Sequence, residues 1–201
     1  MKILNIAAGK MPILNDLLSR PPLTVPTFTV NLDTMYYHHT PVDVIEHHLN
    51  HWDTLLDQDS KVYYCKEDAF EFLERTQIQF DIVAMYRFLE HVSFTQILYF
   101  IYLVSTCMHI GGVVDVIVPN YYTLAEMILD DDVENPEFEE RNILLTTELL
   151  NEPSCPHASI WTPQRAKHFW EFEGRFSVSE VDPHFVYDGR NIYLRFQAVR
   201  V

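Results

Sequence analysis

The sequence has little glycine, with 5 glycines among 201 residues. The pattern G-x-G-x-x-G, which lets a backbone approach the pyrophosphate of a dinucleotide, is absent. The first apolar run, residues 3–8, ends at the single glycine Gly9, and Lys10, Met11 and Pro12 follow. Such a run and glycine are typical of the first strand and loop of a nucleotide-binding sheet. The missing glycines nevertheless disfavour a nicotinamide-dependent oxidoreductase.

Basic residues are also scarce: 14 lysines and arginines stand against 29 acidic residues, which gives a formal net charge of -15. Binding to nucleic acid depends largely on lysine and arginine side chains that neutralise phosphates. No basic run occurs in the sequence. The composition therefore disfavours nucleic acid as a partner, and an anionic membrane surface for the same reason.

The cysteines are few and widely spaced: Cys65, Cys107 and Cys155, without a C-x-x-C pair. This usage favours free thiols in a reducing compartment over a disulfide framework. The first residues carry one lysine before a short apolar run, whereas a secretory signal has a longer apolar core. We therefore expect a cytoplasmic protein.

One long stretch, from Val92 to Val114, lacks Asp, Glu, Lys and Arg. Several polar residues interrupt it, and Gly111 and Gly112 end its apolar part, so a membrane span is disfavoured. We predict a helix over 93–110 that is buried on most sides and capped at its C-terminus by Gly111. Since a surface helix normally carries charge, one face of this helix is expected to contact a second copy or another protein.

Five histidines gather in one region, and His47 and His51 stand four residues apart on one predicted helix face. This spacing can chelate a metal, but the pattern H-E-x-x-H is absent. A solvated helix face explains the pattern better, and we predict no metal site. The group consists of His38, His39, His47, His48 and His51.

Apolar runs with strand character alternate with helical patterns along the chain, which predicts an α/β fold with a mostly parallel sheet. The pair Asp188–Gly189 predicts a closing β-hairpin. Thr123 and Glu126 have the spacing of a capping box and predict the start of a helix. The predicted strands are 2–8, 27–33, 61–65, 80–86 and 113–120, and the other predicted helices are 14–20, 41–56, 68–76, 141–150 and 163–173.

Four stretches, taken in order, resemble the class I S-adenosylmethionine-dependent methyltransferases, in their branch of small single-domain members. These stretches are "LNIAAGKMPI", "FTVNLD", "CKEDAFEFL" and "FDIVAMYRFLEHV", and "GGVVDVIVPNY" follows the last of them. The resemblance implies a three-layer Rossmann-like fold with a seven-stranded, mostly parallel sheet and an antiparallel C-terminal hairpin. It implies one domain over 1–201, with a cofactor-binding half at 1–120. Residues 121–201 would then hold a substrate-side insert, the last helix and the closing hairpin.

The resemblance also implies residues that bind S-adenosylmethionine. Ala7 and Gly9 would form the loop beside the ligand, and Asp33 would accept hydrogen bonds from the ribose hydroxyls. Asp68 would accept from the adenine amino group, with the backbone of Ala69 and the ring of Phe70 beside it. Backbone carbonyls around Tyr86 would hold the amino group of the methionine part.

Structural alternatives stand beside these roles. Asp33 is also explained by a helix cap or a solvated turn, and Asp68 by a cap on the helix that follows it. Phe70 is as well explained by core packing as by an adenine wall. Gly9 suits a strand-to-helix turn with or without a ligand.

The residues around the acceptor are predicted from the same resemblance. His91 is the first candidate for a general base, since its ordinary pKa suits proton uptake near neutrality, and a role at a helix start is the alternative. Tyr121, Tyr122, His157 and Trp161 would contact the substrate or serve packing and anchoring.

The D-P-P-Y signature of amino-methylating DNA enzymes is absent after the fourth strand. The predicted function is thus in-line methyl transfer to a small or sugar-like acceptor, either free or attached to a macromolecule. The alternative is an inactive protein of this fold that acts as a binding or assembly subunit.

Overall fold

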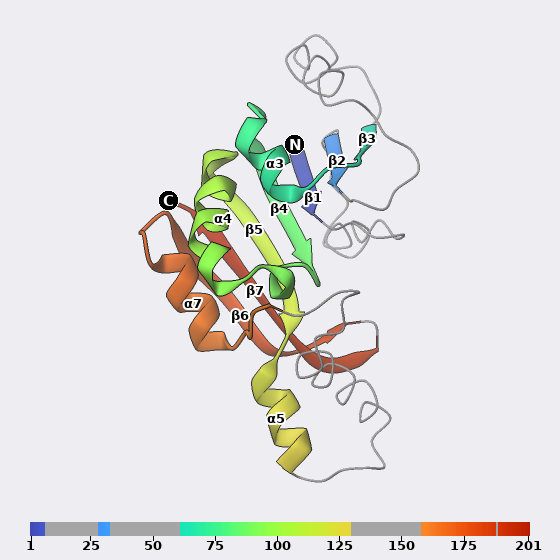
Figure 1. Ribbon diagram of the computed structural model, residues 1–201, viewed down its shortest axis with the longest axis vertical. Coiled ribbons are helices and arrows are strands. Elements are labelled where there is room, and N and C mark those ends of the chain that lie inside the picture. Colours follow the sequence, from blue (N-terminus) through green and yellow to red (C-terminus); the bar gives the residue numbers. More distant parts are fainter. Residues whose placement is uncertain (7–27, 33–60, 130–157, 188) are drawn as a thin grey trace.

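The computed structural model describes residues 1–6, 28–32, 61–129, 158–187 and 189–201. Its centre is a sheet of seven strands in the order β3-β2-β1-β4-β5-β7-β6 (Figure 1). The first five strands in the chain pair in parallel, and β7 runs antiparallel to both β5 and β6. This arrangement confirms the predicted seven-stranded α/β sheet with an antiparallel C-terminal hairpin. The strands are β1 (Lys2–Ile6), β2 (Phe28–Leu32), β3 (Lys61–Cys65), β4 (Phe80–Tyr86), β5 (Met108–Pro119), β6 (Phe176–Tyr187) and β7 (Arg190–Arg200).

The central strands are buried on both faces, which the apolar runs of β1 and β4 predict, whereas the segment of β2 has an alternating pattern. All five residues of β2 are buried, and so are the last four residues of β1 and of β4. The bounds of β3 and β4 agree with the predicted strands 61–65 and 80–86. In β7, Ile192, Leu194, Phe196 and Ala198 are buried while Arg195 and Gln197 are half-buried, but Tyr193 is buried as well, so the alternation of the sequence is followed only from Leu194 onward.

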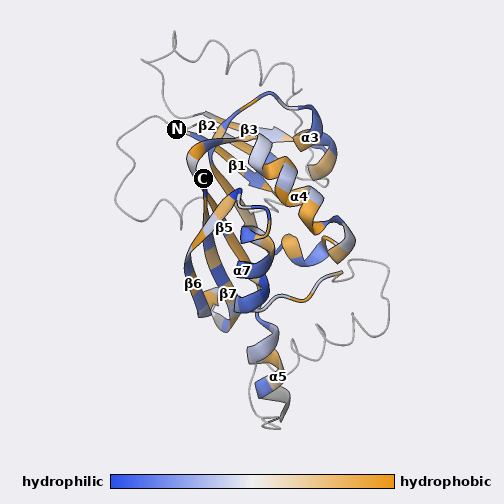
Figure 2. Ribbon diagram, turned by 90° about the vertical axis from the view of Figure 1, so that its left-hand side faces the viewer, coloured by the Kyte–Doolittle hydropathy of each residue, from blue (hydrophilic) through white to orange (hydrophobic). Residues whose placement is uncertain are grey.

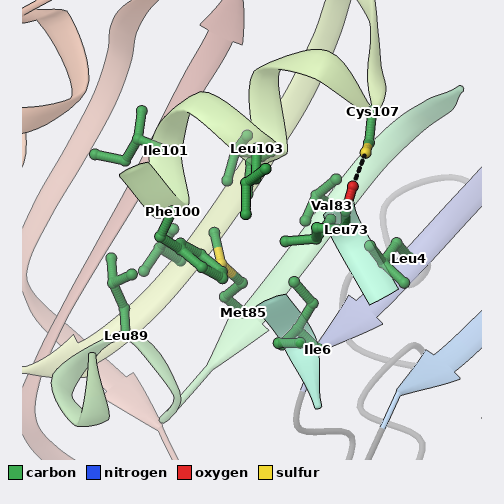
Figure 3. Packing of buried hydrophobic residues seen from close by; sticks show 14 of the residues in the cluster. Leu4, Ile6, Leu73, Val83, Met85, Leu89, Phe100, Ile101, Leu103 and Cys107 are labelled. Atoms are coloured by element: carbon green, nitrogen blue, oxygen red, sulfur yellow. Dashed lines mark hydrogen bonds between the residues drawn. The ribbon is translucent and has the colours of Figure 1, made fainter. Parts of the chain in front are cut away.

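Three helices lie along one face of the sheet: α3 (Ala69–Arg75), α4 (Phe94–Thr106) and α7 (Pro163–Glu171) (Figures 1 and 2). Figure 3 shows Phe100 and Leu103 of α4 above Met85, Val83 and Ile6 of the sheet. The thiol of Cys107 donates a hydrogen bond to the carbonyl oxygen of Leu73, at 3.4 Å. This packing forms the main core of the described residues.

Other predicted elements lie outside the described residues. These are the helices 14–20, 41–56 and 141–150 and the histidine group. The third layer of the predicted three-layer fold therefore stays a prediction. In the part of the chain that the structure describes, no helix has the length and apolar character needed to cross a membrane.

The predicted helix 93–110 was too long, and its cap was wrong. Helix α4 ends at Thr106, and Cys107 caps it by donating its N–H to the carbonyl oxygens of Leu103 and Val104. Met108 then pairs with Phe80 and begins β5, so pairing with β4 ends the helix early. Gly111 lies within β5 with a φ of +83°, where the register between β4 and β5 shifts. It therefore serves an irregular strand rather than a helix end.

The predicted capping box at Thr123 was also wrong. Helix α5 (Tyr121–Leu129) begins two residues earlier, where the side-chain oxygen of Asn120 accepts a hydrogen bond from the N–H of Tyr122 at 3.1 Å. The amide nitrogen of Asn120 donates to the carbonyl oxygen of Pro183 at 2.6 Å, which ties this helix start to β6. Asparagine is a strong N-cap residue, and this tertiary contact holds it in place.

The remaining helix and the hairpin follow the sequence more closely. Helix α7 begins at Pro163, as predicted, and ends at Glu171 rather than at 173. Tyr187 pairs with Arg190 across the predicted turn, where Gly189 has a φ of +77°. A two-residue hairpin turn needs such positive φ angles, which glycine adopts without strain.

The outer face of α4 carries aromatic rather than charged side chains. Phe94, Tyr99 and Tyr102 are 36%, 48% and 39% exposed, and the hydroxyl of Tyr99 donates to Glu74 at 2.9 Å. The predicted partner contact of this uncharged helix stays a prediction.

Candidate functional site

The predicted cofactor residues follow the carboxyl ends of the parallel strands, which meet at one edge of the sheet. Strands β1, β2, β3 and β4 end at Ile6, Leu32, Cys65 and Tyr86, and open α/β sheets bind ligands beyond such ends. Three of the predicted residues, Ala7, Gly9 and Asp33, lie outside the described residues. The site can therefore be built from the segments that follow β3 and β4.

Asp68 caps α3. Its Oδ1 atom accepts hydrogen bonds from the backbone N–H groups of Phe70, at 2.8 Å, and of Glu71, at 3.4 Å. This confirms the alternative that the sequence left open for Asp68. Both cap hydrogen bonds use Oδ1, so the cap does not occupy Oδ2. The predicted adenine contact stays a prediction.

The two residues after Asp68 pack toward the core. Ala69 is buried, and the ring of Phe70 is half-buried. The Phe70 ring centre lies 5.2 Å from that of Phe100, edge to face, and 6.4 Å from that of Tyr99. Phe70 thus takes part in the packing of α3 on α4, which agrees with the core-packing alternative. The predicted contact of its ring with adenine stays a prediction.

Tyr86 is held by its side chain within a buried polar network. Its hydroxyl donates to Oδ2 of Asp115 at 2.7 Å, and Arg195 donates from two nitrogens to the two oxygens of Asp115, each at 2.9 Å. Burial, and then the negative charge of Asp115, raise the pKa of Tyr86 well above its ordinary value. The side chain therefore anchors the end of β4, and only the backbone of Tyr86 is left for the predicted ligand contact.

The chain turns sharply after β4. Arg87 has a φ of +56°, in the left-handed region that residues other than glycine rarely adopt. Its N–H donates to the carbonyl oxygen of Ile117 at 2.8 Å, which holds the turn against β5. A short 3-10 helix, η2 (Leu89–His91), follows and leads into α4. His91 is half-buried there, and its N–H donates to the carbonyl oxygen of Phe88 at 2.9 Å.

Glu90 is a residue that the sequence analysis did not single out. Glu90 is 1% exposed, and its Oε2 has no hydrogen-bond partner among the described residues. Burial raises the pKa of this carboxyl to about 8, against the smaller opposite effects of a backbone hydrogen bond and of the charge on Arg87. The sequence signal was present in "LEHV", but no pattern showed that the acid, rather than the histidine, would be buried.

A strap formed by residues 158–161 connects η2 to the start of α5. The N–H groups of Ala158 and Ser159 donate to the carbonyl oxygen of Glu90, at 2.8 and 3.0 Å. The Ser159 hydroxyl donates to the carbonyl oxygen of Leu89 at 3.1 Å and accepts from Nε1 of Trp161 at 2.9 Å. The carbonyl oxygen of Trp161 in turn accepts from the N–H of Tyr121 at 3.2 Å. The strap thus fixes the turn after β4 relative to the first residues of α5.

The predicted acceptor residues are distributed around this strap. Trp161 is fully buried and packs on Phe196, with ring centres 6.2 Å apart, which is the anchoring role that the sequence left open. Tyr121 is half-buried, and Tyr122 is 51% exposed. His157 lies outside the described residues. The structure therefore brings the turn that carries His91 close to the segment that carries Tyr121.

The comparisons with known proteins agree with this architecture. No family model and no curated protein matches the sequence. Among solved structures, an O-methyltransferase family protein from Burkholderia thailandensis is 15% identical, with a TM-score of 0.56 over 99% of this chain and 50% of its own. The N-methyltransferase NodS from Bradyrhizobium japonicum, in complex with S-adenosyl-L-homocysteine, is 10% identical, with a TM-score of 0.56 over 99% of this chain and 77% of its own. The mitomycin 7-O-methyltransferase MmcR is 13% identical, with a TM-score of 0.57.

Some of these proteins are longer than this chain. It spans about half the length of the protein from Burkholderia thailandensis and about half the length of MmcR. At such low identity the likeness concerns the fold. The sheet order, the antiparallel position of β7 and the helices on the described face together show that this chain has the fold of the class I S-adenosylmethionine-dependent methyltransferases.

Proposed function

We propose that the protein is an S-adenosylmethionine-dependent methyltransferase. The observation that carries the proposal is the sheet, in which β7 lies antiparallel between β5 and β6, matched over 99–100% of this chain by structures named as methyltransferases. One of the matched structures is named as a complex with S-adenosyl-L-homocysteine, and another as a complex with SAM.

The described residues fit such a cofactor. Asp68 has an oxygen that its cap does not use, and Glu90 has a buried oxygen without a partner in the described segments. Both residues follow strands whose carboxyl ends form one edge of the sheet. Ala7, Gly9 and Asp33 would complete the binding residues, with Ala69, Phe70 and the backbone of Tyr86. The bound cofactor would supply an activated methyl group, and the protein would align the acceptor with it.

We propose that the acceptor is a small or sugar-like group, free or attached to a macromolecule, and that transfer occurs in line. Tyr121 and Tyr122 begin α5 beside the strap, where they would contact the acceptor, with His157 immediately before the strap. His91 would take a proton from a hydroxyl or ammonium acceptor. The net charge of -15 supports an acceptor other than nucleic acid.

The proposed location is the cytoplasm. Cys65 and Cys107 are buried free thiols, which supports a reducing compartment. Burial raises the pKa of Cys65 to about 12, with a further contribution from Glu67, so this thiol is unreactive at neutral pH.

The test is calorimetric titration of the folded protein with S-adenosylmethionine and S-adenosylhomocysteine. We expect micromolar binding that Asp33→Ala abolishes and that Asp182→Ala, on the exposed side of β6, leaves unchanged. Absence of binding by a folded wild-type protein would refute the proposal and would favour the inactive assembly subunit.

If both ligands bind, His91→Asn should preserve their affinity and remove methyl transfer to a panel of sugars, phenols and amines. Transfer that His91→Asn leaves unchanged would exclude this residue as the base.

A further inference from the structure

The buried carboxyl of Glu90 is the feature of the described residues that the proposed function does not yet explain. Acidic side chains are almost never fully buried unless they are paired, and buried polar atoms nearly always have a hydrogen-bond partner. Glu90 is 1% exposed, and no group in the part of the chain that the structure describes forms a hydrogen bond with its Oε2. Removing a carboxyl from water without a partner is costly, so its retention at this position needs a reason.

The position of Glu90 is fixed by the elements around it. Its backbone carbonyl accepts from two N–H groups of the strap, and Leu89 beside it accepts from Ser159. The turn that contains Glu90 directly follows β4, at the edge of the sheet where ligands bind in open α/β folds. The strap therefore fixes the backbone that carries the Glu90 side chain.

The charged groups near Glu90 are few among the described residues. Arg87 and His91 share its turn, and Arg87 is exposed. The strap, residues 158–161, has no titratable side chain, and neither does the first turn of α4. On β5, which packs against η2, the acid Asp115 is already bound by Arg195 and Tyr86. No described cation forms an ion pair with Glu90.

We propose that Glu90 is the counter-charge for the ammonium group of the cofactor's methionine part, and that it gives up its proton when this cation binds. The inference rests on the proposed function. In the free protein the neutral carboxyl predominates, because burial disfavours the ionised form more than a backbone hydrogen bond and the charge of Arg87 favour it. A cation within about 6 Å favours the ionised form, so binding transfers one proton from a Glu90 oxygen to the buffer. No other bond is formed or broken.

The raised pKa of Glu90, about 8, is consistent with this exchange at neutral pH. A carboxyl with this pKa is protonated in about nine molecules of ten at pH 7, and it ionises fully beside a bound cation. The affinity for the cation-bearing ligand should then rise by about tenfold for each pH unit between pH 6 and 7, and it should level off above pH 8.

The experiment is calorimetric titration with S-adenosylhomocysteine at pH 7 in phosphate and in Tris, whose heats of ionisation differ. The difference in binding heat between the two buffers gives the number of protons released. We expect nearly one proton per ligand for the wild type and none for Glu90→Gln. Glu71→Gln, an exposed acid in the first turn of α3, is the matched control and should behave as the wild type.

A second ligand, which lacks the ammonium group, tests whether proton release depends on that group. 5′-Methylthioadenosine has the adenosine and the thioether but no ammonium group, so its binding should release no proton from either protein. Between pH 6 and 8 its affinity should be constant, whereas that of S-adenosylhomocysteine should rise for the wild type only.

The outcomes are distinguishable. Binding of S-adenosylhomocysteine without proton release by the wild type, or with equal release by Glu90→Gln, overturns the inference and leaves the proposed function standing. Equal proton release by 5′-methylthioadenosine overturns it as well. A folded wild type that binds neither ligand refutes the proposed function and the inference together. The number of protons that the wild type releases per bound ligand tests the inference even if Glu90→Gln does not fold.

Discussion

Replacement of Asp115 by asparagine tests the polar network that holds the end of β4. Asp115 is 1% exposed as a side chain, and Arg195 is 16% exposed, so their ion pair is largely shielded from water. Asp115 also accepts from the hydroxyl of Tyr86 and, at 3.4 Å, from the amide of Gln197. Asparagine has nearly the same shape as aspartate but carries no charge. Its NH₂ group would replace one of the two oxygens that accept hydrogen bonds from Tyr86, Arg195 and Gln197.

The expected loss follows from the burial of the pair. Removing one partner of a buried ion pair costs about 3–5 kcal/mol, because the other charge is left without compensation. For a protein of 201 residues, about 1 kcal/mol corresponds to a change in Tm of about 2–4 °C. We therefore expect Asp115→Asn to lower Tm by about 6–20 °C.

Urea and thermal denaturation, followed by circular dichroism, measure this loss. The matched control is Asp182→Asn, since Asp182 is exposed and also stands opposite Arg195 in the sheet register. We expect a change within about 0.5 kcal/mol for the control. The double replacement Asp115→Val with Arg195→Met should recover part of the stability, because apolar side chains can replace a buried ion pair, although the hydroxyl of Tyr86 then lacks its acceptor. Equal losses for Asp115→Asn and Asp182→Asn would refute the reasoning.

Three further predictions concern the turn after β4, the strap and β5. The pKa of Glu90 is higher in the folded protein, about 8, than in the unfolded chain, so the folded state retains a proton that the unfolded state loses. Denaturation at several pH values should therefore show Glu90→Gln gaining stability over the wild type as pH rises from 5 to 8, and a constant difference would contradict this. Ser159→Ala should cost about 1–3 kcal/mol, since it leaves the buried Nε1 of Trp161 without an acceptor, whereas Ser179→Ala on exposed β6 should cost almost nothing. Gly112→Ala should lower Tm, because its Cβ would lie 2.9 Å from the carbonyl oxygen of His109, and an unchanged melting curve would show that β5 can shift.

The local patterns of the sequence were sufficient for most of the described strands. "KVYYC" and "FDIVAMY" predicted β3 and β4 with their observed bounds, because short runs rich in β-branched and aromatic residues favour strands. The Asp188–Gly189 turn and the alternation that begins at Ile192 predicted the hairpin of β6 and β7. The order of these elements also gave the fold class and the resemblance to methyltransferases.

The boundaries depended on contacts that no local pattern contains. The run 93–110 has helical character throughout, but pairing of Met108 with Phe80 draws its last residues into β5. Likewise, Thr123 has capping-box spacing, but Asn120 caps the helix because Pro183, 63 residues away, binds its amide.

Some features of the candidate site could likewise be predicted from the sequence, and others depend on the tertiary structure. The sequence alone placed Asp68, Tyr86 and His91 after the strands that form one edge of the sheet, because strand order determines which segments end there. Only the tertiary structure paired Asp115 with Arg195, 80 residues apart, and laid Ser159 against Leu89, 70 residues away. It also decided that Glu90 rather than His91 would be buried. Burial and the availability of a hydrogen-bond partner are properties of the packed chain, and they cannot be read from the spacing of residues along it.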